Sequence, residues 1–586
     1  MKSDITKKAL EMSKEQKAIS VAEFFEKNRH LLGYNTLQKA LLTIVREGVD
    51  NSLDACEHAG ILPDIFVQVE DLGDNIYKVT IEDNGPGIKK ENVPYVFGKL
   101  LFGSKFMKLA QTRGQQGIGI SGAVLYSQLT TGKPTKIYSK IGDGNVHIFE
   151  LGINIEKNEP DVLYHETLPG NGHGVRLEIY AKGKYVRGKQ SIEEYLKQTA
   201  IMNPHAQITF IDPDGNEIIY ERVIETLPSL PKEIKPHPYG IELGYLMRLL
   251  SRTKSKSLLS FLMKEFSRVG EKTAKEILAR ASLSPDDAPS SLTRIEAERL
   301  LNAMQSISIP APPTDCLSPV GEEAIKEGLK KELTPEFVVA ISRKPKVYRG
   351  FPFLVEVGIA YGGNIQLEVA KIYRYANKVP LLYEQGACAL TKAFQEVDWK
   401  RYGIKQSSNG FPEAPMIVSI NFASVWVPYT SESKEAISHY EEIIKEVKLA
   451  LQDAARSLQR YLSKVHKAKA SQERKSKFIR YIGEIATSLS ILTSKPKEEI
   501  EKNLNLLVAK FVKDYSKEIA EMQDKDYREH IMSDKDEVSK EKKEDLEITL
   551  ESNKESKDVE FEIESLIDDI KVKISQKKLS DYGEKQ

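Results

Sequence analysis

The stretch from residue 37 to 57 has the periodicity of an amphipathic helix. Its apolar positions form one stripe at 100° per residue: Leu42, Val45, Val49, Leu53 and Cys56. Glu47, Asn51 and Asp54 gather on the opposite side at spacing i, i+4, i+7. A solvated face is the ordinary explanation for such a cluster, but a carboxylate beside an amide can also polarise water and ligate a hard cation.

Period-two alternation downstream predicts strands, so that residues 20–225 combine helical and strand patterns. The predicted strands are 64–70, 76–82 and 172–180. Four prolines from Pro228 to Pro238 then predict a linker. Residues 241–305 lack strand alternation and predict a small domain of short helices, which the proline-rich segment 309–314 closes.

The rest of the chain returns to a mixed pattern before it becomes helical and then highly charged. Strand-like stretches lie at 351–360 and 416–427, and a helical run rich in Glu and Lys extends from about 434 to 480. After about residue 520 the composition is acidic on balance with few aromatics, which predicts a flexible or loosely helical tail. The fold class expected is therefore α+β with several domains.

Composition narrows the class of protein. The 586 residues contain 85 Lys and Arg against 85 Asp and Glu, so that any contact with nucleic acid must come from local basic patches. No run of 18 apolar residues occurs, and the N-terminus has no apolar signal region. Cys56, Cys316 and Cys388 stand far apart, which is typical of a reduced, cytoplasmic protein.

Two glycine segments follow the first predicted helix. The strand over 76–82 ends in Asp83-Asn84-Gly85-Pro86-Gly87, where glycines permit a turn and the close approach of a ligand. The second segment, residues 114–122, has the spacing GxxGxG and precedes a helical pattern, so that its N–H groups could bind phosphate. No Lys-Ser/Thr follows, which excludes a Walker A loop.

Taken together, these motifs resemble the nucleotide-binding (Bergerat) α/β sandwich of the GHKL ATPases. The resemblance implies that Glu47 is the general base for the attacking water, that Asn51 ligates Mg²⁺, and that Asp83 accepts the adenine amino group of ATP. Gly85 and Gly87 would shape the adenine pocket. The phosphate lid would contain Gly114, Gln115, Gln116, Gly117, Ile118, Gly119, Ile120 and Ser121, with Ser104 and Lys105 beside it. His173 stands where the family has Thr.

Longer segments resemble the family of DNA topoisomerase VI B subunits. They include AEFFEKN at 22–28, KPHPYG at 235–240, RYANKVPLLY at 374–383 and PYTSESKEAI at 428–437. The resemblance implies four parts: a GHKL domain over 1–228, a helix-two-turn-helix domain over 229–308, a transducer domain with a long C-terminal helix over 309–486, and a charged extension over 487–586.

In that family, ATP drives two B subunits to dimerise and gates strand passage through a double-strand break. The break is made by the A subunit in an assembly of two A and two B chains, and the outcome is relaxation and decatenation of DNA. The chain carries no EGDSA-like Toprim motif, which agrees with this division of labour. The alternative is an ATP-gated clamp of the Hsp90 or MutL type.

Basic segments predict surfaces that face DNA. The candidate residues are Arg252, Lys254, Lys256, Arg343, Lys344, Trp399 and Lys400. Phosphate contacts without base recognition suit an enzyme that acts on DNA crossings, although an ordinary solvated surface is the simpler explanation for any one segment.

Lys434 is singled out by the resemblance alone. Nothing in its local sequence, Ser431-Glu432-Ser433-Lys434, distinguishes it from a surface lysine at the start of a helix. The segment TSESKEAI matches the transducer loop whose lysine reaches the γ-phosphate in the family, so that Lys434 is expected to act in ATP hydrolysis.

Overall fold

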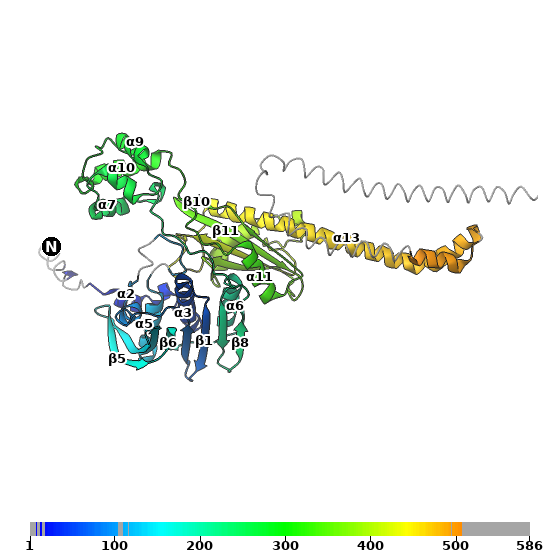
Figure 1. The fold of residues 1–586 in the computed structure, drawn as a ribbon, viewed down its shortest axis with the longest axis horizontal. Coiled ribbons are helices and arrows are strands. Elements are labelled where there is room, and N and C mark those ends of the chain that lie inside the picture. The colour runs from blue at the N-terminus through cyan, green and yellow to red at the C-terminus, as the bar shows by residue number, and fades with distance from the viewer. Residues whose placement is uncertain are drawn as a thin grey trace, which may run out of the picture. The chain divides into compact units, whose positions relative to one another are not determined.

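The computed structural model describes Lys8 and residues 12–13, 18–103, 109–114, 117–493 and 495–506 (Figure 1). These residues divide into a unit that ends at Lys464 and a second unit that begins at Val465. The first unit contains two β-sheets and a helical part. The charged tail expected after residue 520 lies outside the described residues.

The first sheet has eight strands in the order β5-β4-β3-β6-β2-β1-β7-β8. Their bounds are β1 (Asp64–Asp71), β2 (Ile76–Asp83), β3 (Thr135–Ile141), β4 (Asn145–Asn154), β5 (Glu159–Pro169), β6 (His173–Lys182), β7 (Gln207–Ile211) and β8 (Glu217–Tyr220). All neighbours are antiparallel except β1 and β7, which are parallel. The three strands expected within residues 20–225 are β1, β2 and β6, each within two residues of its predicted bounds.

Helices α3 (Leu37–Ala59) and α5 (Gly119–Thr131) pack against this sheet (Figure 1), as α6 (Ile192–Met202) does against β7. The preceding elements are α2 (Val21–Lys27) and the 3-10 turn η1 (Arg29–Leu32), and α4 (Val93–Gly98) follows β2. The Thr36 side chain caps α3 by accepting from the backbone N–H of Lys39, and Gly60 ends the helix in the left-handed region at φ 72°. All five residues of the expected apolar stripe are buried.

The helical part begins after an irregular segment at 221–237. It contains η3 (Pro238–Gly240), α7 (Leu243–Arg252), α8 (Leu258–Glu265), α9 (Glu271–Ala281), η4 (Pro289–Ser291) and α10 (Arg294–Ser306), which share one apolar core. Thr293 and Glu296 form a reciprocal capping box at the start of α10. The expected linker and short helices are therefore present.

The second sheet has the order β10-β11-β14-β12-β13, and β9 also pairs with β11. Its strands are β9 (Phe337–Ser342), β10 (Lys346–Tyr348), β11 (Phe351–Tyr361), β12 (Lys371–Ala376), β13 (Val379–Pro380) and β14 (Met416–Ser424). Its shorter helical elements are α11 (Glu322–Leu333), η5 (Gln385–Ala387), α12 (Ala389–Gln395) and η6 (Trp399–Tyr402). α11 packs on both β9 and α6, so that it joins the two sheets.

The long helix α13 extends from Glu441 to Thr493. Its first turns bury Ile443, Val447 and Leu451 in the core of the second sheet. The helix was expected to start near residue 434, but residues 434–440 are not helical, and Lys434 has a left-handed φ of 55°. A non-glycine residue in that region interrupts a helix, so the segment before α13 is a loop.

Candidate functional site

Glu47 and Asn51 lie one turn apart on α3, as the sequence predicts. The Glu47 carboxylate is 13% exposed and pairs with the neighbouring Arg46, whose Nη2 lies 3.1 Å from Glu47 Oε1. This arrangement leaves a partly buried carboxylate on the same face as the Asn51 amide.

Asp83 ends β2 beside α3, and its carboxylate is held by three donors. Ser52 Oγ donates to Oδ2 at 2.8 Å, while the N–H groups of Gly85 and Val175 donate to Oδ1 at 2.9 and 3.2 Å. Burial raises the pKa of Asp83 from its ordinary value, and these hydrogen bonds oppose the rise. The side chain is therefore fixed in orientation, which suits an acceptor that must recognise one donor on a ligand.

Gly87, in the first glycine segment, occupies a position that has no room for a side chain. Its φ is 73°, and a Cβ there would lie 1.9 Å from the carbonyl oxygen of Lys140. His173, at the position where Thr was expected, brings its Nδ1 to 2.9 Å from the Gly85 carbonyl oxygen. The imidazole thus supports the turn that follows Asp83.

The second glycine segment lies along the Glu47 and Asn51 face of α3. A Cβ on Gly119 would lie 1.8 Å from Glu47 Oε2, and one on Gly114 would lie 3.9 Å from Asn51 Oδ1. Gly119 is the first residue of α5, and no side chain caps that helix end. The uncapped start of α5, which is the positive end of its dipole, therefore lies against the polar face of α3.

The other residues predicted in or beside the lid are only partly described by the structure. Ser121 is buried, and Ile118 and Ile120 belong to or pack against the apolar core, so that only their backbone groups can meet a ligand. Gly117 adopts a φ of 66°. Ser104, Lys105, Gln115 and Gln116 lie outside the described residues.

The loop that carries Lys434 reaches the same helix from the second sheet. Arg46 donates to the Ser433 carbonyl oxygen at 3.5 Å, and Lys39 forms a buried ion pair with Glu435. Lys39, Arg46, Lys434 and Glu435 line one small pocket. Lys434 thus belongs to a loop anchored on α3 beside Glu47, although it lies far from α3 in the sequence.

Asp50 is a titratable neighbour of this site that the sequence analysis did not single out. It accepts a hydrogen bond from the Tyr195 hydroxyl at 2.9 Å. Burial, followed by the nearby charge of Glu47, raises the pKa of Asp50 to about 7. Its position on the helix gave no signal, because burial of a carboxylate depends on the elements that cover it.

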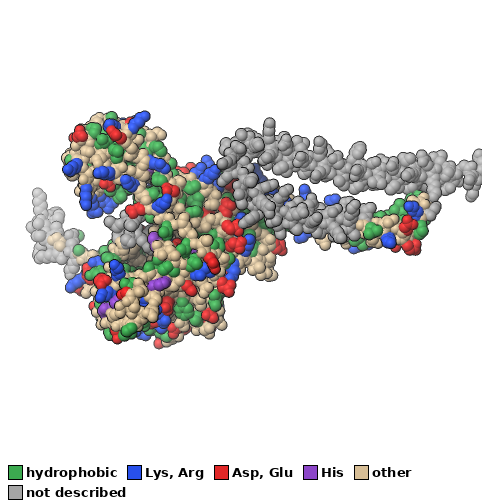
Figure 2. All heavy atoms as spheres, viewed as in Figure 1, with side chains coloured by type: hydrophobic (Ala, Val, Ile, Leu, Met, Phe, Trp, Pro, Cys, Tyr) green, Lys and Arg blue, Asp and Glu red, His purple; other side chains and the backbone are tan. Residues whose placement is uncertain are grey.

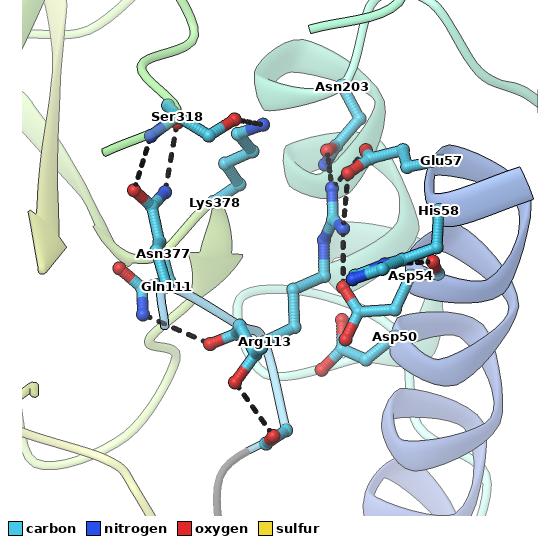
Figure 3. Close-up of polar contacts among 12 residues, drawn as sticks. Asp50, Asp54, Glu57, His58, Gln111, Arg113, Asn203, Ser318, Asn377 and Lys378 are labelled. Carbon is cyan, nitrogen blue, oxygen red and sulfur yellow. Dashed lines mark hydrogen bonds and ion pairs between the residues drawn. The ribbon is translucent and has the colours of Figure 1, made fainter. Parts of the chain in front are cut away.

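Asp54, which the sequence grouped with Glu47 and Asn51, takes part in a different structure. Arg113 donates to Asp54 Oδ1 at 2.7 Å and to the Glu57 oxygens at 2.6 and 3.0 Å (Figure 3). Arg113 is 5% exposed. Burial favours the protonated form of Glu57, but Arg113, Lys378 and His205 outweigh it and hold the pKa of Glu57 well below its ordinary range. Arg113 directly precedes the second glycine segment, but its sequence position did not reveal this pairing.

The candidate DNA-contacting residues differ in exposure. Arg252, Lys254, Lys256, Lys344 and Lys400 are exposed or partly exposed, and Figure 2 shows Lys and Arg side chains gathered on the helical part. Arg343 is paired with Glu446 and Asp453 at 2.8 and 2.7 Å.

Trp399 was wrongly expected at the DNA-facing surface. It is fully buried, and its indole N–H donates to the Phe394 carbonyl oxygen at 3.1 Å. Its aromatic ring stabilises the core of the second sheet, where apolar neighbours cover it.

The described part of the chain contains neither a cluster of metal-ligating side chains nor a membrane-spanning helix. Among its residues, no three or more His, Cys, Asp or Glu side chains are grouped to hold a metal ion. No helix in the described ranges has the length and apolar character needed to cross a membrane.

Two family descriptions match parts of this chain. Residues 36–156 match "Histidine kinase-, DNA gyrase B-, and HSP90-like ATPase", and residues 312–474 match "Topoisomerase VI B subunit, transducer". Among solved structures, the 43K ATPase domain of Thermus thermophilus gyrase B aligns at 14% identity with a TM-score of 0.34, over 77% of this chain and 97% of that one.

Curated relatives match over most of the chain. The B subunit of type 2 DNA topoisomerase 6 from Archaeoglobus fulgidus is 53% identical, covering 77% of this chain and 76% of the relative. The B subunits of the same enzyme from Methanosarcina barkeri and Pyrococcus horikoshii are 50% and 43% identical, covering 86% and 84% of this chain and 83% and 95% of the relatives.

Proposed function

Because the chain belongs to the family of type 2 DNA topoisomerase VI B subunits, we propose that it hydrolyses ATP at the polar face of α3. As a member of this family it is an ATP-binding GHKL subunit that acts on DNA together with an A subunit. The Hsp90-type or MutL-type alternative is excluded, since the transducer match extends over residues 312–474.

The observation that carries the proposed site is the position of Gly119 against Glu47. A Cβ at Gly119 would overlap Glu47 Oε2 at 1.8 Å, so that the uncapped start of α5 and the carboxylate share one narrow space. Phosphate oxygens bound by the α5 N–H groups would therefore lie beside a carboxylate that can accept a proton from water. Asp83, held by three donors, would accept the adenine amino group between Gly85 and Gly87.

Asn51 fits the role of a magnesium ligand. Its amide oxygen lies near Gly114 and is a hard ligand for metal ions. Mg²⁺ in phosphate sites commonly takes one or two protein oxygens. Bound Mg²⁺ would neutralise phosphate charge. Arg46 joins this site to the loop of Lys434, whose ammonium would stabilise the charge that develops on the terminal phosphate.

We also propose how the chain assembles with a second B subunit, with A subunits and with DNA. ATP binding would bring two B subunits together in an assembly of two A and two B chains, and hydrolysis would reset that gate during passage of one duplex through another. The residues Arg252, Lys254, Lys256, Lys344 and Lys400 would contact DNA phosphates. The salt dependence of DNA binding by an Arg252→Ala/Lys254→Ala/Lys256→Ala variant tests this surface, and an unchanged slope contradicts it.

The Glu47→Gln variant tests the ATPase site. It should bind a non-hydrolysable ATP analogue as the wild type does, yet turn over ATP on the order of 10²–10⁴ more slowly, since the general base is lost. Steady-state ATPase with the A subunit and DNA present measures the effect, and Glu70→Gln, at a partly exposed position near the end of β1, is the matched control. Wild-type turnover in Glu47→Gln would rule out this assignment.

A further inference from the structure

Three consecutive residues before the second glycine segment are each bonded to a different partner. Gln111 and Thr112 contact the second sheet and its flanking loop, whereas Arg113 contacts α3 (Figure 3). All three are buried. The chain is therefore clamped between two parts of the first unit immediately before it reaches Gly114.

On the α3 side the clamp is an ion-pair network. Besides Asp54 and Glu57, Arg113 Nη2 donates to Asn203 Oδ1 at 2.6 Å, and His205 Nε2 lies 2.8 Å from Glu57 Oε1. A guanidinium bound by two carboxylates in a buried site has a fixed direction, because its fork geometry matches the carboxylate oxygens.

On the other side the clamp consists of neutral hydrogen bonds. Gln111 and Ser318 form a reciprocal pair: Gln111 Nε2 donates to the Ser318 carbonyl oxygen at 2.9 Å, and the Ser318 N–H donates to Gln111 Oε1 at 2.8 Å. Asn377 Nδ2 donates to the Thr112 carbonyl oxygen at 3.0 Å and to that of Ser424 at 3.0 Å. One transducer side chain thus bridges the segment before the glycines and the end of β14.

The turn that supplies Asn377 is costly for the fold. Asn377 and Lys378 connect β12 to β13 with φ values of 50° and 71°, a conformation in which glycine is usually preferred at the second position. Lys378 is also buried, and its ammonium donates to Ser318 Oγ at 3.2 Å. Burial lowers the pKa of Lys378, although Glu57 favours its charged form. Strain and a buried charge at one turn point to a function for that turn.

The clamp lies directly upstream of the proposed site. Gly114 follows Arg113 and faces Asn51, and Gly119 lies against Glu47. A shift of Gln111–Arg113 relative to α3 would therefore displace Gly114 from Asn51.

We propose that Asn377 and Lys378 of the transducer are positioning residues for the ATPase site. They hold Gln111–Arg113 in one register on α3, so that Gly114 and Gly119 meet Asn51 and Glu47 in the geometry needed for turnover. This role rests on the proposed ATPase site. It gives the transducer a second contact with that site, separate from the loop of Lys434, through which the state of the transducer affects ATP hydrolysis.

The substitution Asn377→Gly tests the role while preserving the turn, because glycine adopts φ 50° without strain. In the full chain, amide hydrogen exchange in the peptide 109–121 should become roughly fivefold faster, because this segment loses the one hydrogen bond, from Asn377 to Thr112, that the substitution removes from it. With the A subunit and DNA present, kcat for ATP should fall severalfold with little change in KM. The matched control is Asn75→Gly, an exposed turn residue at φ 58° between β1 and β2.

The result that overturns the proposal is exchange in the peptide 109–121 equal to that of the wild type, or acceleration that extends equally to the ends of β11 and β14 remote from Ser424, at Tyr361 and Met416. Lys378→Met is a second variant, which removes the buried charge and should accelerate the same peptide. A different result would show that the ATPase site itself is wrongly assigned. In that case a non-hydrolysable ATP analogue would not slow exchange of the peptide even in the wild type, whereas the effect of Asn377→Gly without nucleotide would remain measurable.

Discussion

Two segments of α3 present carboxylates in contrasting surroundings. Glu47 is paired with Arg46 from its own helix and lies against the backbone of Gly119. Asp54 and Glu57, about two turns further on, are held by Arg113 from another part of the chain. Neighbouring positions on one helix can therefore serve opposite purposes. Asp54 and Glu57 are bound by a guanidinium remote in the sequence, whereas Glu47 is paired with its neighbour on the same helix and lies against the start of α5.

The largest effect is expected for the segment of α3 that contains Asp54 and Glu57. Arg113→Met should lower the free energy of unfolding by about 3–5 kcal/mol, because it leaves Asp54 and Glu57 buried without their cation. Denaturant unfolding of the full chain measures this. Arg187→Met is the matched control: that arginine also binds two carboxylates but is 59% exposed, and its loss should leave the free energy of unfolding nearly unchanged because solvent screens the pairs. Equal losses in the two variants would remove the distinction between the segments.

The second prediction concerns the loop that meets the Glu47 segment. Lys434→Ala should reduce ATP turnover on the order of 10²-fold, because it removes a cation from the developing phosphate charge, while stability stays nearly unchanged. ADP binding should be retained, since the lysine is expected to contact only the terminal phosphate. ATPase assays and equilibrium ADP binding decide this, with Lys445→Ala on the exposed side of α13 as control. Normal hydrolysis would make Lys434 an ordinary surface residue.

Substitutions of Asn51 and Asp83 should change affinity and leave the fold intact. Asn51→Ala and Asp83→Asn should each weaken binding of a non-hydrolysable ATP analogue roughly tenfold, because each removes a hydrogen-bonding or metal-ligating group. Calorimetric titration measures the dissociation constants. Asp74→Asn, in the exposed β1–β2 turn, should bind as the wild type does. Unchanged affinity in both pocket variants counts against the pocket.

Asp50 lies between the two segments of α3, and its titration should make the free energy of unfolding depend on pH. Its pKa of about 7 means that the folded chain binds a proton that the unfolded chain, with an ordinary aspartate pKa, has released. The stabilising contribution is therefore complete below about pH 4 and is lost as the pH rises through 7. Asp50→Asn keeps an oxygen that accepts from the Tyr195 hydroxyl. As the pH rises from 6 to 7, the free energy of unfolding of this variant should increase by about 1 kcal/mol relative to that of the wild type. If the free energies of unfolding of the variant and the wild type differed by the same amount at pH 6 and at pH 7, the assignment would be contradicted.

Much of the local structure could be predicted from the sequence, because it follows from short-range periodicity. The apolar stripe of α3, strands β1, β2 and β6, and the turn after Asp83 all follow from side-chain spacing and glycine placement. The nearness of Glu47 and Asn51 needs only the helical repeat.

The tertiary structure alone decided which partner each charged side chain of α3 has. Sequence spacing grouped Asp54 with Glu47, but Arg113, 59 residues beyond Asp54, binds it. Trp399 stands among basic residues in the sequence and yet lies in the core, while Lys434 belongs to a loop anchored on α3 from the second sheet. Helical periodicity assigns a side chain to a face, but its burial and its partners depend on contacts between segments remote in the chain. Those contacts determine whether a carboxylate stabilises the fold or remains available for chemistry.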